Sequence, residues 1–304
     1  MQKLGLALDW TPNINHIGFF VAQKKGFYKA LDLKVEITSP DMDNYQITPA
    51  KRVELGQVDF ALCPTESIIS YRSKEKPFPL IAIAAILQSD LSAIATKVYA
   101  GIHSPKDLDH KIYSSYKARY ENGIVREMIK NDGGNGNLKI IYPDTLGIGN
   151  TLMNGKADAT WVFMNWEGVA ADQAGIPLNY FKLKDYKIPY SYSPVLATNE
   201  SLILAKIDAY QAFLKATKKG FLYCSNHPGE AIDILKEELP EYDQGMDLSA
   251  SLNMTIPHFG NEENWGVIST TNLKKFLTWI KKKKLEAKTF HTEEIFTDIW
   301  TAQN

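Results

Sequence analysis

Aromatic and polar side chains follow several short apolar runs of this sequence. Trp10 and Asn13 come after the apolar run at residues 4–8, and Trp161 and Glu167 lie in and just beyond another at residues 157–163. Ligands of open α/β sheets bind beyond the carboxyl ends of the strands. Flat rings stack on planar heteroaromatic groups. Amide or carboxylate groups form specific hydrogen bonds with an amino group beside a ring nitrogen. The residues predicted to bind a small amino-substituted aromatic ring are Trp10, Asn13, His16, Glu66, Ser67, Tyr116, Arg119, Trp161, Asn165, Trp166, Glu167, Tyr190 and Tyr192.

Most of these residues also have a structural interpretation. A single aromatic side chain at a strand end is more often part of the core or of an interface between lobes than part of a ligand site. Glu66 stands where a helix is predicted to begin, and an acidic group stabilises a helix N-terminus without any ligand. Asp9 and His16 can brace the first turn, and Arg119 can complement an anionic substituent. Asp144 and Thr145 also follow a predicted strand.

Motifs of common enzyme and metal sites are absent from the sequence. It contains no GxxxxGK[ST], HExxH, CxxC or GxSxG pattern, and the scattered histidines lack metal-ligand spacing. Cys63 ends a predicted strand, but no histidine partner for a nucleophilic cysteine can be placed beside it. We therefore expect a binding protein with no metal and no cofactor.

The composition indicates a folded, nearly neutral protein with a small partner. The chain has 304 residues, with 34 Lys and Arg against 35 Asp and Glu. This balance predicts no nucleic-acid partner, and no run approaches the length of a membrane span. The first strand is predicted from Leu4, which leaves no room for a signal peptide. As written, the chain is expected in the cytoplasm, or in the periplasm or anchored outside the membrane if a signal has been removed.

The strand and helix pattern occurs twice. Each occurrence, called a pass below, consists of a strand, a helix, a strand, a helix and a strand. Asp59 and Asp158 occupy matching positions near the start of the third strand of each pass. The first pass comprises strand 4–9, helix 15–25, strand 33–38, helix 49–56 and strand 58–63. The second comprises strand 111–115, helix 119–131, strand 138–142, helix 145–154 and strand 157–163.

This repetition predicts an α/β protein with two lobes, each a mostly parallel sheet flanked by helices, because parallel strands need helical crossovers. Runs near residues 81–96 can carry the chain out of the first lobe, and residues 194–198 can carry it back. We expect residues 1–92 with 195–304 to form lobe I, and residues 93–194 to form lobe II, with a ligand cleft between the lobes.

Four segments resemble the thiamine-pyrimidine-binding proteins of ABC importers. They are Leu8-Asp9-Trp10-Thr11-Pro12-Asn13-x-Asn15-His16, the Gly-x-Val-Asp-Phe strand leading to Glu66-Ser67, Trp161-x-Phe-x-x-Trp166-x-Gly168, and Tyr192-x-Pro194-Val195 with Thr198-Asn199-Glu200. The resemblance implies a type II periplasmic binding fold that captures formylaminopyrimidine or hydroxymethylpyrimidine. It implies stacking on Trp10, Tyr190 and Trp166, with hydrogen bonds from Asn13, Glu66, Asn165 and Glu167. An importer permease is the implied partner.

The same superfamily contains the fungal-type hydroxymethylpyrimidine phosphate synthases, which use a lysine, a histidine and a cysteine-rich segment with pyridoxal phosphate. In this sequence the lysine position falls on Cys63 and the histidine position on Ser67. The cysteine-rich segment falls on residues 189–193, which contain no cysteine. The sequence therefore favours a pyrimidine-binding protein. A synthase-like enzyme of thiamine biosynthesis and a sensor or carrier of the pyrimidine remain as alternatives.

Overall fold

The computed structural model describes residues 1–143, 147–190 and 192–300. The chain divides into two compact units. The first comprises Met1–Ser89, Tyr192–Leu273 and Phe290–Asn304, and the second comprises Asp90–Ser191 and Lys274–Thr289. The crossings lie three residues from the predicted boundaries at 92/93 and 194/195. The segment 274–289, which the sequence assigned to lobe I, belongs to the second unit.

Ion pairs and hydrogen bonds explain why the segment 274–289 belongs to the second unit. Lys283 Nζ lies 2.6 Å from Glu127 Oε2, and Tyr120 donates a hydrogen bond to Glu286 Oε2 at 2.5 Å. Glu127 and Tyr120 belong to the helix α4 region of the second unit. These partners could not be paired from the sequence, because more than 150 residues separate them.

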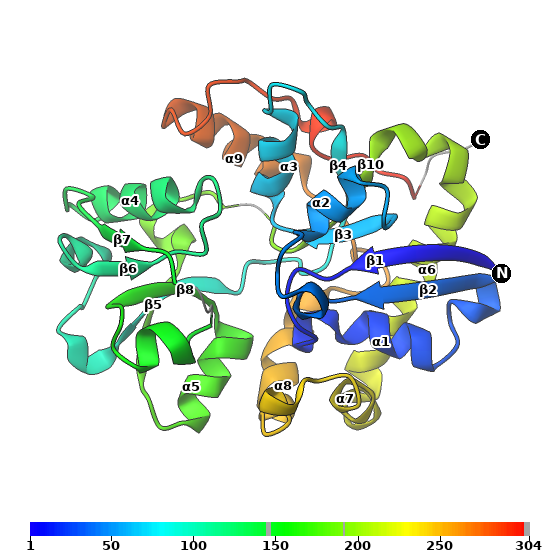
Figure 1. Ribbon diagram of the computed structural model, residues 1–304, viewed down its shortest axis with the longest axis horizontal. Coiled ribbons are helices and arrows are strands. Elements are labelled where there is room, and N and C mark those ends of the chain that lie inside the picture. The colour runs from blue at the N-terminus through cyan, green and yellow to red at the C-terminus, as the bar shows by residue number, and fades with distance from the viewer. Residues whose placement is uncertain (144–146, 191, 301–304) are drawn as a thin grey trace. The chain divides into compact units, whose positions relative to one another are not determined.

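Each unit contains a five-stranded mixed sheet (Figure 1). The strand order is β2-β1-β3-β10-β4 in the first unit and β7-β6-β8-β5-β9 in the second. Four strands of each sheet run in one direction, and the fourth position in each order holds the reversed strand, β10 or β5. The strands are β1 Gln2–Ala7, β2 Leu33–Thr38, β3 Phe60–Cys63, β4 Leu80–Ala85, β5 Ser92–Lys97, β6 Ile112–Ser114, β7 Lys139–Ile141, β8 Ala159–Phe163, β9 Leu178–Phe181 and β10 Val195–Asn199.

The two sheets therefore have the same topology, as the sequence repeat predicted. In each unit the reversed strand is the first strand after a crossing: β5 follows the crossing out of the first unit, and β10 follows the crossing back. The matching aspartates also make matching contacts. Asp59 Oδ2 accepts the backbone N–H of Gly5 at 2.9 Å, and Asp158 Oδ2 accepts that of Ile112 at 2.8 Å.

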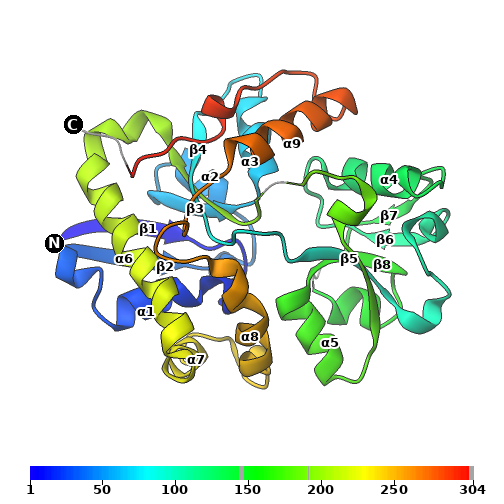
Figure 2. The same ribbon diagram turned by 180° about the vertical axis from the view of Figure 1, so that it is seen from behind.

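Helices cover both faces of each sheet. Figure 1 shows α2 in front of the first sheet, and Figure 2, from behind, shows α6 in front of it. In the second unit α4 and α5 lie on opposite sides of the sheet (Figure 1). The helices are α1 Ile17–Lys24, α2 Pro49–Glu54, α3 Thr65–Arg72, α4 Glu121–Asn131, α5 Val169–Gln173, α6 Ile207–Asn226, α7 Pro228–Lys236, α8 Leu248–Phe259 and α9 Thr270–Lys282.

Two predicted helices differ in detail. The helix predicted at residues 15–25 begins with a 3-10 turn at Ile14–His16 before α1, because Asn13 caps that turn through its side chain. The helix predicted at residues 145–154 is a π-helical turn at Gly149–Met153, and residues 144–146 lie outside the described residues. No helix among the described residues has the length and apolar character needed to cross a membrane.

Two glycines allow α1 and α6 to pack closely. A Cβ at Gly220 would lie 2.0 Å from the backbone oxygen of Gly18, and a Cβ at Gly18 would lie 2.2 Å from the Phe221 ring. Any side chain at either position would therefore separate the two helices. The contact buries a ring cluster in which Phe60 and Phe213 stack at 4.3 Å between centroids.

Candidate ligand-binding site

The second unit brings two of the predicted binding residues, Trp161 and Tyr190, together. The rings of Trp161 and Tyr190 lie 5.3 Å apart at 61° between planes, and both side chains remain partly exposed. Trp161 belongs to β8, and the Tyr190 ring also contacts Phe276 of α9 at 5.6 Å. Edge-to-face contacts of this kind fix the orientation of both rings. A rigid aromatic surface follows, supplied by two segments that are distant in the sequence.

Polar residues follow β8 directly. Asn165, Trp166 and Glu167 lie on the π-helical turn Met164–Gly168, with Asn165 and Trp166 buried and Glu167 half-buried. One oxygen of Glu167, Oε2, accepts the backbone N–H of Phe163 at 2.9 Å. This bond ties the carboxylate to the end of the strand, so that its orientation is set by the backbone.

Glu121 organises the loop that carries Tyr116. Its carboxylate accepts hydrogen bonds from Tyr113 Oη at 2.7 Å and Ser115 Oγ at 3.0 Å, and from the backbone N–H groups of Tyr116 and Ala118. Burial raises the pKa of the Glu121 carboxyl, against the effect of these donors. Burial also raises the pKa of Tyr116 well above its ordinary value, and the nearby Glu167 and Glu121 raise it further. Tyr116 therefore remains a neutral hydrogen-bonding group beside Glu167.

Arg119 lies at the opposite end of that loop and is engaged in an ion pair. Its Nη2 lies 3.0 Å from Oε2 of Glu286, whose side chain is buried. The same carboxylate accepts the hydroxyl of Tyr120, and its other oxygen accepts the backbone N–H of Lys288. Arg119 is 44% exposed, and its predicted interaction with an anionic substituent stays a prediction.

In the first unit the loop after β1 is held together by its own polar side chains. His16 is fully buried, and its Nδ1 accepts the backbone N–H of Asn13 at 3.3 Å. The other ring nitrogen therefore carries the proton, and Nε2 donates to Asp9 Oδ1 at 2.8 Å. Asn13 uses its amide to accept from Asn15 N and to donate to the Thr11 oxygen. These bonds match the bracing interpretation, and the ligand roles of Asn13 and His16 stay predictions.

The end of β3 contributes Glu66, which is buried, and Ser67, which is half-buried. Both lie in the first turn of α3. Thr65 donates its hydroxyl to the backbone oxygen of Tyr192 at 2.7 Å, and the Tyr192 hydroxyl accepts the N–H of Ser269 at 3.0 Å. Tyr192 is therefore hydrogen-bonded to two other segments of the first unit, at Thr65 and at Ser269.

The predicted residues are distributed between the units. The first unit holds Trp10, Asn13, His16, Glu66, Ser67 and Tyr192, and the second holds Tyr116, Arg119, Trp161, Asn165, Trp166, Glu167 and Tyr190. Asp144 and Thr145 lie outside the described residues.

Sequence reasoning missed two tyrosines of the first unit. The Tyr45 ring lies 5.4 Å from the Trp10 ring at 52°, and Tyr242 lies next to Tyr45. Neither tyrosine follows an apolar run directly. The expectation that ligand-binding residues follow the carboxyl ends of strands therefore did not select them. Tyr45 is identified by its contact with Trp10, and Tyr242 by its position near Tyr45.

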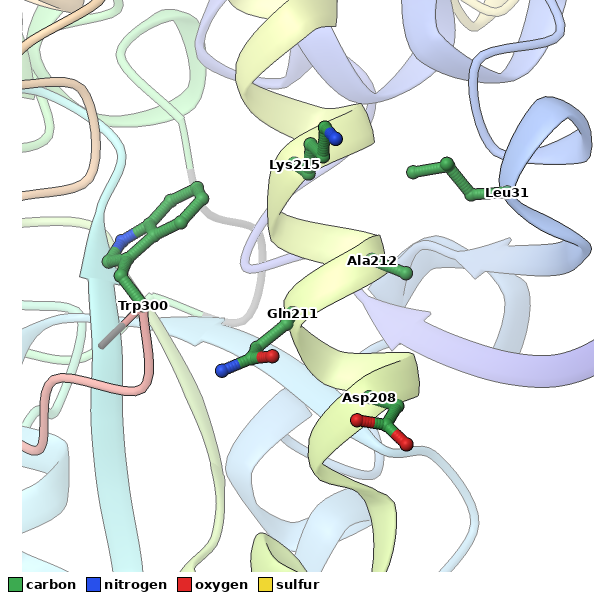
Figure 3. Close-up of a pocket in the computed structure, with 6 residues that line it drawn as sticks. All are labelled: Leu31, Asp208, Gln211, Ala212, Lys215 and Trp300. Carbon is green, nitrogen blue, oxygen red and sulfur yellow. The ribbon is translucent and has the colours of Figure 1, made fainter. Parts of the chain in front are cut away.

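A hollow of about 380 Å³ lies elsewhere on the first unit (Figure 3). Its lining side chains come from α6, the segment before β2 and the C-terminal region: Leu31, Asp208, Gln211, Ala212, Lys215 and Trp300. Leu31 precedes β2, whereas Trp10 follows β1, which runs parallel to β2. The hollow thus lies at the strand edge opposite to the one expected for a ligand. No group of three or more His, Cys, Asp or Glu side chains that could hold a metal occurs among the described residues.

The family model described as "NMT1/THI5 like" matches residues 13–231. The chain belongs to the NMT1/THI5-like family. The family assignment confirms the resemblance to thiamine-pyrimidine-binding proteins and their superfamily.

Two curated relatives of this NMT1/THI5-like chain have different functions. It is 26% identical over 238 residues to the formylaminopyrimidine-binding protein of Halalkalibacterium halodurans, covering 77% of this chain and 70% of the relative. It is 25% identical over 253 residues to the 4-amino-5-hydroxymethyl-2-methylpyrimidine phosphate synthase of Legionella pneumophila, covering 79% and 75%.

A solved structure confirms the predicted fold. The Candida albicans CA3427 gene product, which has the generic periplasmic binding protein fold, matches with a TM-score of 0.72 at 18% identity, covering 98% of this chain and 97% of that one. The NMT1/THI5-like chain therefore has a periplasmic binding protein fold.

Proposed function

We propose that this protein is a solute-binding protein for a thiamine-related aminopyrimidine. The observation that carries the proposal is the Trp161–Tyr190 ring pair beside the β8 turn that holds Asn165 and Glu167. A partly exposed aromatic surface next to a backbone-anchored carboxylate suits a flat ring that carries an amino group. The similarity to a formylaminopyrimidine-binding protein supports the same ligand class.

In this proposal the polar residues form hydrogen bonds with the polar groups at the edge of the ligand's ring. A carboxylate accepts hydrogen bonds only, so Glu167 and Glu66 would accept from the ligand's amino group. The amide of Asn165 can both donate and accept, as a ring nitrogen beside an amino group requires. The proposed set of binding residues is completed by Trp10, Asn13, His16, Ser67, Tyr116, Arg119, Trp166 and Tyr192.

We further propose delivery of the ligand to the permease of an ABC importer, or to another protein that uses the pyrimidine. The fold supports this proposal because solute-binding components of importers share it. The first function to test is nevertheless binding, since delivery depends on it.

A synthase-like enzyme is the second candidate, and the Legionella pneumophila relative favours it. The residues at the end of β3 do not fit pyridoxal phosphate held through a lysine. Cys63 stands at the expected lysine position, is buried, and offers a thiol in place of an amine. Burial raises the pKa of that thiol, so it stays protonated at neutral pH.

Titration calorimetry of the full chain tests the binding proposal. Formylaminopyrimidine and 4-amino-5-hydroxymethyl-2-methylpyrimidine should bind with micromolar or lower Kd, and should raise the Tm in proportion to the logarithm of their concentration. Absence of binding by both pyrimidines at millimolar concentration would refute the proposal. A new absorbance band after addition of pyridoxal phosphate, abolished in Lys117→Arg, would instead favour the synthase.

A further inference from the structure

The segment between β2 and α2 has an unusual backbone that places Tyr45. Asn44 and Tyr45 adopt left-handed conformations, with φ of 54° and 61°. This region costs a residue with a side chain about 1–2 kcal/mol. An aromatic residue held in it is therefore a reason to look for a function at that position.

Hydrogen bonds keep the segment in this conformation. The Tyr45 N–H donates to the Pro40 oxygen at 2.8 Å. Asp43 Oδ2 pairs with Arg52 Nη2 at 2.6 Å and accepts the Ile47 N–H at 3.2 Å. The charge of Asp43 is thus paired with Arg52 of α2, which anchors the turn to that helix.

The anchored turn places Tyr45 against Trp10 and near Tyr242, so three separate segments contribute an aromatic residue here. Tyr45 packs on Trp10 at 5.4 Å between ring centroids and remains 43% exposed. Tyr242, on the 3-10 turn Glu241–Asp243 between α7 and α8, is 71% exposed. Burial raises the pKa of Tyr45, and the nearby Tyr242 raises it further. Tyr45 and Tyr242 therefore both remain exposed to solvent.

Acidic groups accompany these rings. Asp243 is half-buried, and burial raises the pKa of its carboxyl to about 6. Within residues 1–143, 147–190 and 192–300, this carboxylate has no ion-pair or hydrogen-bond partner. Asp41 and Asp243 are both close enough to Tyr45 to affect its ionisation. A half-buried carboxylate without a cation is costly unless a ligand supplies one.

We infer that Trp10, Tyr45, Tyr242 and Asp243 form a recognition element in the first unit for a positively charged substituent on the ligand. A cation over the face of Trp or Tyr is attracted by the ring, and the carboxylate adds a charge partner. This inference rests on the proposed function and specifies its ligand: an aminopyrimidine with an alkylammonium group binds more tightly than one with a neutral group.

Two pyrimidines that differ in one group test this inference. We would titrate the full chain at pH 7.5 with 4-amino-5-aminomethyl-2-methylpyrimidine, which is cationic, and with its neutral 5-hydroxymethyl counterpart. The cationic compound should bind the unmodified protein about tenfold more tightly. Asp243→Asn and Tyr242→Ala should remove most of that advantage while changing the Kd of the neutral compound less than about twofold.

Further variants separate recognition from folding. Tyr45→Asn removes the ring but keeps a residue that tolerates positive φ, and it should also reduce the preference for the cation. Tyr99→Ala removes a tyrosine of similar exposure, 68%, from the second unit and should leave both Kd values unchanged. Equal binding of the two compounds, or equal weakening of both in Asp243→Asn, would overturn the inference.

The inference can fail separately from the proposed function. If the unmodified protein binds neither pyrimidine, the proposed function fails, and benzylammonium is then compared with benzyl alcohol in the same proteins. A preference for benzylammonium that disappears in Asp243→Asn supports the recognition element. No preference, or one that Asp243→Asn retains, overturns it.

Discussion

Asp59 and Gly5 are joined by two hydrogen bonds that link β3 to β1. Asp59 Oδ2 accepts the Gly5 N–H at 2.9 Å, and the Asp59 N–H donates to the Gly5 oxygen at 3.0 Å. Asp158 and Ile112 repeat the arrangement in the second unit, with both distances at 2.8 Å. The repeated aspartate of the sequence is therefore a structural residue. It joins β1 to the start of β3 in the first unit, and β6 to the start of β8 in the second.

Asp59→Ala should destabilise the protein by about 1–3 kcal/mol, because it leaves the partly buried Gly5 N–H without its acceptor. It also removes the partner of Lys206 Nζ, which lies 2.6 Å from Asp59 Oδ1. Urea unfolding followed by circular dichroism measures the change. Asp185→Ala, at an exposed position, should change stability by less than about 0.5 kcal/mol. Equal effects of the two variants would contradict the structural role.

Gly220→Ala should cost about 1–3 kcal/mol, because the new Cβ would overlap the Gly18 oxygen where α1 meets α6. Gly229→Ala is the matched control, since a Cβ there meets nothing within 4 Å. Alanine has the higher helix propensity, so the control variant should be neutral or slightly more stable. Thermal unfolding of both proteins gives the comparison, and a Gly220→Ala protein as stable as the unmodified one would show that α1 and α6 can separate without cost.

Asp90 should make stability depend on pH. Burial raises its pKa to about 6, although Ser92 donates two hydrogen bonds that oppose the shift. The folded state then holds more protons than the unfolded state between about pH 4 and 6, so this contribution to stability falls as the pH rises through that window. The contribution is greatest below pH 4 and is lost above pH 6.

Asp90→Asn keeps an acceptor for Ser92 and removes the titration. Its stability relative to the unmodified protein should therefore rise between pH 4 and 6, by about 1 kcal/mol or more. Tm values measured at half-unit pH intervals test this expectation. A constant difference across the window would mean that Asp90 has an ordinary pKa.

Trp161→Ala should weaken aminopyrimidine binding at least about tenfold, because it removes the ring against which Tyr190 is held. Glu167→Gln should weaken it less, since the amide oxygen can still accept the Phe163 N–H but loses the charge that favours an amino donor. Calorimetry with the pyrimidine measures both, and Tyr99→Ala serves as the unaffected control. If Trp161→Ala binds as tightly as the unmodified chain, the ring pair has no role in recognition.

Local signals were enough to predict the repeated architecture. The paired strand and helix pattern around Asp59 and Asp158 predicted two similar sheets, because strand runs and their turn residues are set by short-range sequence. The same signals selected Trp161 and Glu167 at a strand end. The Trp161–Tyr190 contact was not predictable, because Tyr190 approaches along a segment with no strand pattern.

The sequence by itself determined the fold class, the repeat and the residue types available for stacking and hydrogen bonding, because each depends on neighbours along the chain. Only the tertiary structure decided that residues 274–289 join the second unit, through Glu286 and Lys283, and that Tyr45 packs on Trp10 with Tyr242 near Tyr45. These contacts join residues distant in the sequence, and their formation depends on how the whole chain packs rather than on any local pattern.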